Sequence, residues 1–176
     1  MWWVMRHAVA ILILPMTVVV VVPAWLARSS GAEIALPVTV VEWATVVLGL
    51  GSLVAGGVLF SACLKRFASR GEGTLAPWDP PVHLVVSGPY AYVRNPMISG
   101  VLLILVAEAL ILRSMPHLGW AGIFFLINAT YIPLLEEPAL EARFGREFEE
   151  YKEHVPRMIP RPRPWRGARS DQGRAT

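Results

Sequence analysis

Two segments of the chain combine the residue types that a binding site for a small charged molecule requires. Residues 87–100 read SGPYAYVRNPMISG and supply an arginine, two tyrosines and turn-forming residues directly before an apolar segment. The pair Glu136-Glu137 follows the next apolar segment. Arginine binds carboxylates through paired hydrogen bonds, and carboxylates attract ammonium or sulfonium cations. Placed at one end of a helical hairpin, these segments predict a site for a charged, partly aromatic cofactor.

The composition indicates that most of the chain lies in lipid. Of 176 residues, 55% are hydrophobic and only 16% are charged, which is too apolar for an ordinary soluble domain. Lipid cannot satisfy exposed backbone groups, so the expected fold class is an all-α integral membrane bundle. The single cysteine, Cys63, excludes an internal disulfide, and the four histidines lack the spacing of zinc ligands, so no metal is expected. No phosphate loop or dinucleotide-binding fingerprint is present, and no nucleic-acid partner is expected.

Four apolar segments are candidate membrane spans. Residues 8–27 and 38–64 contain 20 and 27 residues, and each is long enough to cross a hydrocarbon core that needs roughly 20 helical residues. Residues 97–112 and 118–135, with 16 and 18 residues, are shorter and are expected to form a helical hairpin. We therefore expect about four transmembrane helices.

The distribution of Lys and Arg predicts the orientation of the bundle. With four spans, 14 of the 16 basic residues fall on the side that holds both termini and the loop 65–96. By the positive-inside tendency, that side is cytoplasmic. The basic tail between Arg157 and Arg174 either lies against anionic headgroups or serves only as this topology signal.

Within residues 87–100, each residue has a functional and a structural interpretation. Pro96 suits the first turn of a helix. The free amides of that turn, together with Arg94, would bind a carboxylate. Alternatively, Arg94 reaches the lipid headgroups. Tyr90 and Tyr92 either stack on an aromatic base or belong to the interfacial aromatic belt. Gly100 allows close approach of a ligand or of another helix.

The glutamate pair is open to two interpretations as well. Glu136 and Glu137 either favour the N-terminus of a helix beginning at Pro138 or bind a cation beside a cavity. That helix is expected to be amphipathic and cytoplasmic, lying on the membrane surface or capping the site. Its apolar face comprises Leu140, Phe144, Phe148 and Tyr151.

One further acidic residue, Glu108, falls inside the third apolar segment. An acid at membrane depth costs a few kcal/mol and normally faces a partner or a cavity. Asn128 and Tyr131 on the fourth segment are the candidate partners.

The ordered combination of these motifs resembles the isoprenylcysteine carboxyl methyltransferase and phospholipid methyltransferase superfamily. The resemblance covers about residues 75–165 and rests on the stretch 87–96, the apolar hairpin, the segment 136–140, Phe144-Gly145, Tyr151 and the stretch 155–160. It implies a bacterial-type enzyme of the inner (plasma) membrane that transfers a methyl group from S-adenosyl-L-methionine to a lipid-like or amphiphilic acceptor. Residues 1–64 would form two N-terminal helices, 65–165 the methyltransferase core, and 166–176 a flexible basic tail.

The resemblance also implies which residues form the site. Arg94 and Glu137 are the expected catalytic residues, with Glu137 or Glu108 available as a base if the acceptor is an amine. Either Glu136 or Glu137 would bind the ammonium group of the methionine moiety. The residues expected to hold the cofactor are His83, Leu84, Val85, Tyr90, Arg94, Asn95, Pro96, Gly100, Glu136 and Glu137.

Two departures from the superfamily pattern concern the acceptor. Asn95 and Ile98 stand where the motif usually has histidine and tyrosine, and residues 130–135 lack the arginine that meets a prenylcysteine carboxylate in eukaryotic members. A prenylated cysteine is therefore poorly supported, and both O- and N-methylation stay open. Two other functions compete: an NADPH-dependent membrane reductase related to sterol reductases, and a non-catalytic membrane scaffold with this fold.

Overall fold

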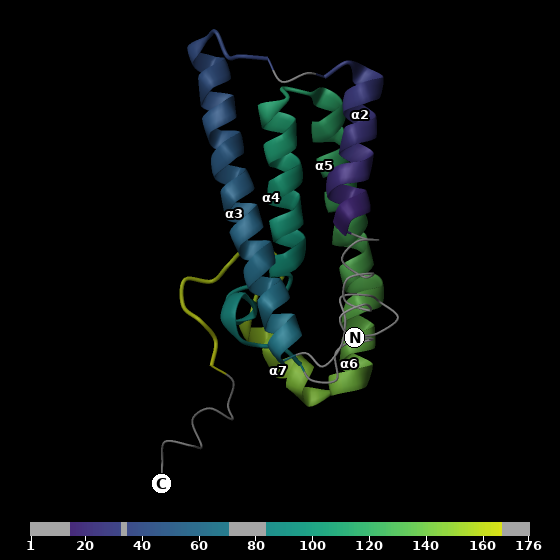
Figure 1. Cartoon of the computed structure of the whole chain (residues 1–176). Helices are drawn as coiled ribbons and strands as arrows, with labels where there is room; N and C mark the ends of the chain where they lie inside the picture. Colours follow the sequence, from purple (N-terminus) through teal and green to yellow (C-terminus); the bar gives the residue numbers. More distant parts are fainter. Residues whose placement is uncertain (1–14, 33–34, 71–83, 167–176) are drawn as a thin grey trace.

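The computed structural model describes residues 15–32, 35–70 and 84–166. In these ranges the chain is all-helical, with the π turn η1 (Thr17–Val21), α2 (Val22–Ser30), α3 (Val40–Arg70), the 3-10 turn η2 (Gly88–Ala91), α4 (Pro96–Ile111), α5 (Met115–Tyr131), the π turn η3 (Ile132–Glu136), α6 (Glu137–Phe144) and α7 (Arg146–His154). Helices α3, α4, α5 and α2 run side by side in this order, as Figure 1 shows.

Two continuous helical stretches among the described residues are long and apolar enough to cross a membrane, Val40–Arg66 and Met115–Phe144. The second continues from α5 through η3 into α6, and so extends well past the segment expected from the sequence. Thr17–Ser30 and Pro96–Ile111 are apolar but shorter. The expected segment 8–27 begins outside the described residues, so four complete spans stay a prediction.

Small residues let α3 and α4 pack backbone against backbone. A Cβ atom added to Gly56 would lie 2.7 Å from the carbonyl oxygen of Gly100, and one added to Gly100 would lie 3.1 Å from the backbone nitrogen of Phe60. Ser52 strengthens the contact by donating a hydrogen bond to the carbonyl of Leu103 over 2.8 Å. Gly100 is therefore explained by helix packing, the second of the two interpretations that the sequence left open.

A buried histidine links α2 to the first turn of α5, at the end of the α4–α5 hairpin where the two helices are connected. His117, only 1% exposed, has Nδ1 2.7 Å from the Ser114 hydroxyl and Nε2 3.1 Å from the carbonyl oxygen of Pro23. Because a carbonyl only accepts, Nε2 carries the proton in this arrangement. Both ring nitrogens are thus satisfied, as a buried polar side chain requires.

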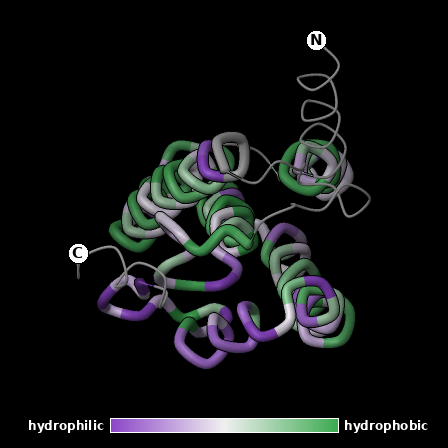
Figure 2. Tube along the Cα trace, turned by 90° about the horizontal axis from the view of Figure 1, so that it is seen from below, coloured by the Kyte–Doolittle hydropathy of each residue, from purple (hydrophilic) through white to green (hydrophobic). Residues whose placement is uncertain are grey.

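The single helix expected from Pro138 is replaced by two. Gly145 ends α6 with φ 52° and ψ −129°, a conformation that residues with a side chain rarely adopt, and α7 leaves in a new direction. The turn brings α7 beneath the lower end of α4 in Figure 1. In the end-on view of Figure 2, hydrophilic residues gather on this end segment, while the long helices are mainly hydrophobic.

Candidate functional site

The motif loop 84–95 is held at the lower end of the bundle by the segment that follows α7. The backbone nitrogen of Arg94 donates to the carbonyl of Pro156 over 2.9 Å, and that of Asn95 donates to Arg157 over 3.3 Å. In return, the nitrogens of Arg161 and Trp165 donate to Tyr92 and Ala91. We call residues 155–166 the C-terminal strap.

Packed side chains fix the same loop from both sides. Tyr151 of α7 is buried and donates its hydroxyl proton to the carbonyl of Tyr90 over 2.7 Å. Tyr90 is itself buried in a cluster with Cys63 of α3 and Val85. Burial raises the pKa of both tyrosines, so their phenols stay protonated near neutral pH.

In an extended loop Tyr90 and Tyr92 would point the same way, but in the structure their surroundings differ. The 3-10 turn η2 buries Tyr90, whereas Tyr92 is 37% exposed. Gly88 begins this turn with φ 65°, which glycine adopts without strain. Tyr90 can therefore form part of the wall of a site, whereas Tyr92 faces outward.

A cavity of about 130 Å³ lies between the motif loop and the chain from Ile132 to α7. Seven of the residues predicted from the sequence line it: Leu84, Val85, Tyr90, Arg94, Asn95, Glu136 and Glu137. The remaining lining residues are Ile132, Leu140, Phe144, Phe148 and Tyr151. Pro96 and Gly100 are not among the lining residues, and His83 lies outside the described residues.

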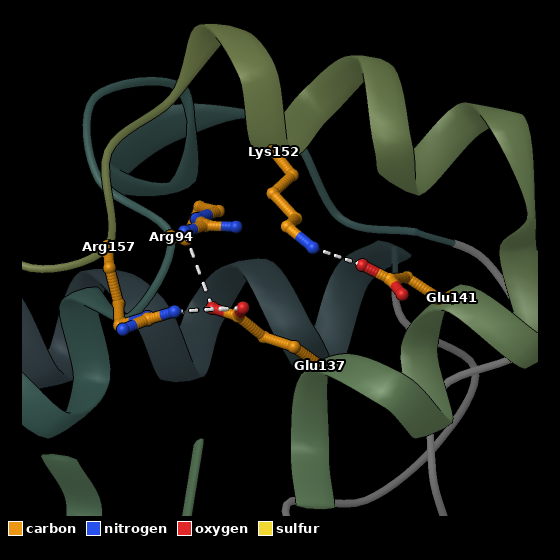
Figure 3. Close-up of polar contacts among 5 residues, drawn as sticks. All are labelled: Arg94, Glu137, Glu141, Lys152 and Arg157. Atoms are coloured by element: carbon orange, nitrogen blue, oxygen red, sulfur yellow. Dashed lines mark hydrogen bonds and ion pairs between the residues drawn. The ribbon is translucent and has the colours of Figure 1, made fainter. Parts of the chain in front are cut away.

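The centre of the site is a carboxylate shared by two arginines (Figure 3). Glu137 is 5% exposed and accepts two hydrogen bonds from Arg157, Nε to Oε1 at 2.8 Å and Nη2 to Oε2 at 2.9 Å. Nη2 of Arg94 lies 3.3 Å from the same Oε1. The hydrogen bonds to Glu137 raise the pKa of Arg157, whereas burial lowers the pKa of Arg94, an effect that Glu137 opposes. An arginine stays charged through such shifts, so the three groups together carry one net positive charge.

Arg94 retains hydrogen-bonding capacity that this ion pair does not use. Within the described part of the chain, its Nε and Nη1 are buried and have no hydrogen-bond partner. Leaving such charged donors unsatisfied is costly, which favours an anionic ligand beside them. Glu136 lines the same cavity, and no described cation forms an ion pair with it. The walls thus offer one unsatisfied cation and one uncompensated carboxylate.

Arg157 is the site residue that sequence reasoning missed. The sequence places it in the basic tail, which either lies against anionic headgroups or serves only as a topology signal, because nothing in its spacing from Glu137 predicts a bidentate ion pair 20 residues away. The available signal was the repeated proline pattern of residues 155–160, which is typical of an extended segment rather than of a helix.

Glu108 lies far from this cavity. It sits 12 residues after Pro96 on α4, which corresponds to about 18 Å along a helix axis. Its Oε2 is buried and lacks a hydrogen-bond partner within the described residues. Asn128, one of its expected partners, instead donates to the carbonyl of Phe124. Glu108 is therefore out of reach as a base at this site.

In its described residues the chain combines helices long and apolar enough to cross a membrane with a largely apolar cavity that holds charged side chains at one end, as expected of a helical membrane protein. The phospholipid methyltransferase family matches residues 44–147, which include most of α3, the motif loop, the α4–α5 hairpin and the glutamate pair. The chain belongs to this family, within the superfamily that its motifs resemble. Membership implies a membrane methyltransferase. No curated protein and no solved structure matches the chain.

Proposed function

We propose that the chain is an S-adenosyl-L-methionine-dependent methyltransferase that acts on a lipid-like or amphiphilic acceptor. The observation that carries the proposal is the pairing, in one cavity, of unsatisfied Arg94 donors with the uncompensated Glu136 carboxylate. An α-amino acid end presents a carboxylate and an ammonium group, which are the two charges that these side chains complement. When bound, the cofactor supplies a methyl group on a positively charged sulfur.

The glutamates have different roles in this proposal. Both oxygens of Glu137 are engaged by Arg157 and one also by Arg94, which leaves Glu136 to hold the ammonium group. The aromatic and aliphatic walls, with Phe144, Phe148 and Ile132, suit the uncharged remainder of the cofactor. This donor set suits a nicotinamide dinucleotide poorly, because Arg94 is the one cation that lines the described cavity.

With the cofactor bound, the described walls of the cavity offer no free general base, because Glu136 then holds the ammonium group. Glu137 is neutralised by two arginines, Glu108 is distant, and Tyr90 and Tyr151 hold their protons. The acceptor therefore brings its own reactive lone pair, as a carboxylate or a neutral amine does. The protein contributes by aligning the two reactants and by excluding water, which are large effects for a transfer between bound partners.

A lipid acceptor is supported by the position of the cavity. The cavity includes Ile132 and Glu136 of η3, where neighbouring apolar side chains such as Leu134 are 65% exposed on the long helix. An apolar surface of this kind faces acyl chains when the helix lies in a bilayer. An amphiphile in the membrane thus has a short path to the site.

Calorimetry on the full chain in detergent tests the cofactor. We expect saturable binding of S-adenosyl-L-methionine and none of NADPH, with loss of most of the affinity in Arg94→Gln. Binding of NADPH alone, or of neither compound by folded protein, would refute the proposal. Methyl transfer from a labelled donor into a lipid extract, followed by chromatography of the labelled product, then identifies the acceptor and shows whether oxygen or nitrogen is methylated.

A further inference from the structure

Arg157 reaches the site from outside the cavity wall. It is not among the lining residues, and its side chain is 36% exposed, compared with 7% for Glu137 and 10% for Arg94. Its guanidinium nevertheless makes the most complete contact at the site, a bidentate pair with both oxygens of Glu137 (Figure 3). A contact of this geometry fixes the carboxylate in position and orientation.

The bidentate pair between Arg157 and Glu137 limits the contacts that Arg94 can make with Glu137. With both carboxylate oxygens engaged by Arg157, Arg94 makes a single contact, from Nη2 to Oε1 at 3.3 Å. Without Arg157, a buried carboxylate beside one arginine would favour a two-pronged pair with Arg94 itself. That arrangement would consume a second guanidinium nitrogen and reduce what Arg94 can offer a ligand.

We propose that Arg157 is a positioning residue, which occupies Glu137 so that the Nε and Nη1 donors of Arg94 are kept available for the carboxylate of the ligand. This inference rests on the proposed function. It adds Arg157 as a residue that affects cofactor binding through Glu137 and Arg94. The C-terminal strap sets the geometry, because the carbonyls of Pro156 and of Arg157 itself accept hydrogen bonds from the backbone of Arg94 and Asn95.

The test compares two ligands that differ only at the amino acid end. S-adenosylhomocysteine carries the carboxylate and ammonium groups, whereas 5′-methylthioadenosine lacks both. For Arg157→Gln in the full chain, we expect the affinity for S-adenosylhomocysteine to fall about 10- to 100-fold, the range for losing a hydrogen bond to a charged group. We expect the affinity for 5′-methylthioadenosine to change less than about twofold, because Arg94 does not contact that ligand's remaining part in this proposal.

Arg161→Gln is the matched control. Arg161 lies on the same strap and carries the same charge, but its side chain donates to the carbonyl of His154 and does not contact Glu137. We expect both affinities to be unchanged in this variant. In an Arg94→Lys background, Arg157→Gln should reduce the affinity for S-adenosylhomocysteine little further, because Arg157 acts on the ligand's carboxylate only through Arg94.

Each other result has a distinct meaning. An equal loss for both ligands in Arg157→Gln, accompanied by a lower melting temperature, would show a purely structural role of the strap and overturn the inference. Unchanged affinity for S-adenosylhomocysteine would overturn it as well, while leaving the proposed function intact. Absence of binding by the wild-type protein would remove the proposed function and this inference together.

Discussion

Adjacent residues of the same type have different surroundings at this site. Glu137 is buried between Arg94 and Arg157, while its neighbour Glu136 lines the cavity without a described cationic partner. Breaking a buried ion pair leaves a charge uncompensated and costs several kcal/mol, whereas a carboxylate without a partner has no such pair to lose. In the proposed function, Glu136 therefore serves ligand recognition and Glu137 supports the site.

Substitution of Glu136 by Gln tests this separation. We expect the affinity for S-adenosyl-L-methionine to fall about 10- to 100-fold through loss of a charge-assisted hydrogen bond, with little change in thermal stability. Calorimetry and thermal unfolding in the same detergent measure the two effects. Glu147→Gln on the exposed surface of α7 is the control, and an equal loss of affinity there would contradict the assignment.

Among the elements, the contact between α3 and α4 is the closest to a backbone-to-backbone fit. Gly56 and Gly100 face each other there, and Gly57, next in sequence, has open space where a Cβ would be. Close approach of this kind depends on small residues, because lipid supplies no hydrophobic force between helices. α4 begins at Pro96, directly after the motif loop, so the fit of α3 and α4 also supports the site.

The paired substitutions Gly56→Ala and Gly57→Ala isolate this fit. A methyl group at Gly56 meets the Gly100 carbonyl at 2.7 Å, so we expect a loss of about 1–3 kcal/mol in the free energy of unfolding, typical of overpacking. Gly57→Ala should be neutral or stabilising by up to about 1 kcal/mol, because alanine is the better helix former. Chemical unfolding in detergent measures both, and equal effects would rule out tight packing at Gly56.

The whole molecule has two chemically different ends. One end carries the cavity and α7, which Figure 1 shows at the bottom of the bundle. The other joins α3 to the α4–α5 turn through an ion pair of Glu42 with Arg113, 3.5 Å apart. The excess of basic residues on the side of the cavity predicts that this end faces the cytoplasm. A water-soluble cofactor would then reach the site directly.

Labelling of single cysteines in intact cells tests this orientation. In a Cys63→Ser background, we expect a membrane-impermeant maleimide to label Ser30→Cys, at the end of α2, and to spare Glu149→Cys on α7. Both positions are exposed, so accessibility within the protein does not distinguish them. Permeabilised cells should show labelling at both positions. The reverse pattern in intact cells would place the cavity on the outer side.

The sequence by itself determined the helical class, the membrane setting, the hairpin and most of the residues that meet at the cavity. Hydropathy sets the helices because lipid leaves the backbone no other way to satisfy its polar groups. Pro96 starts α4 as expected, since proline needs no hydrogen-bond donor in the first turn. The family match supports the same region, from α3 to the start of α7.

Only the tertiary structure decided how the charges are paired. Glu136 and Glu137 are equivalent as neighbours in sequence and both line the cavity, but only Glu137 lies between two arginines. The partner Arg157 depends on the turn at Gly145 and on backbone pairing of the strap with the motif loop. Ion pairs form wherever the fold brings charges together, and spacing along the chain cannot specify a contact made by two segments that meet only after folding.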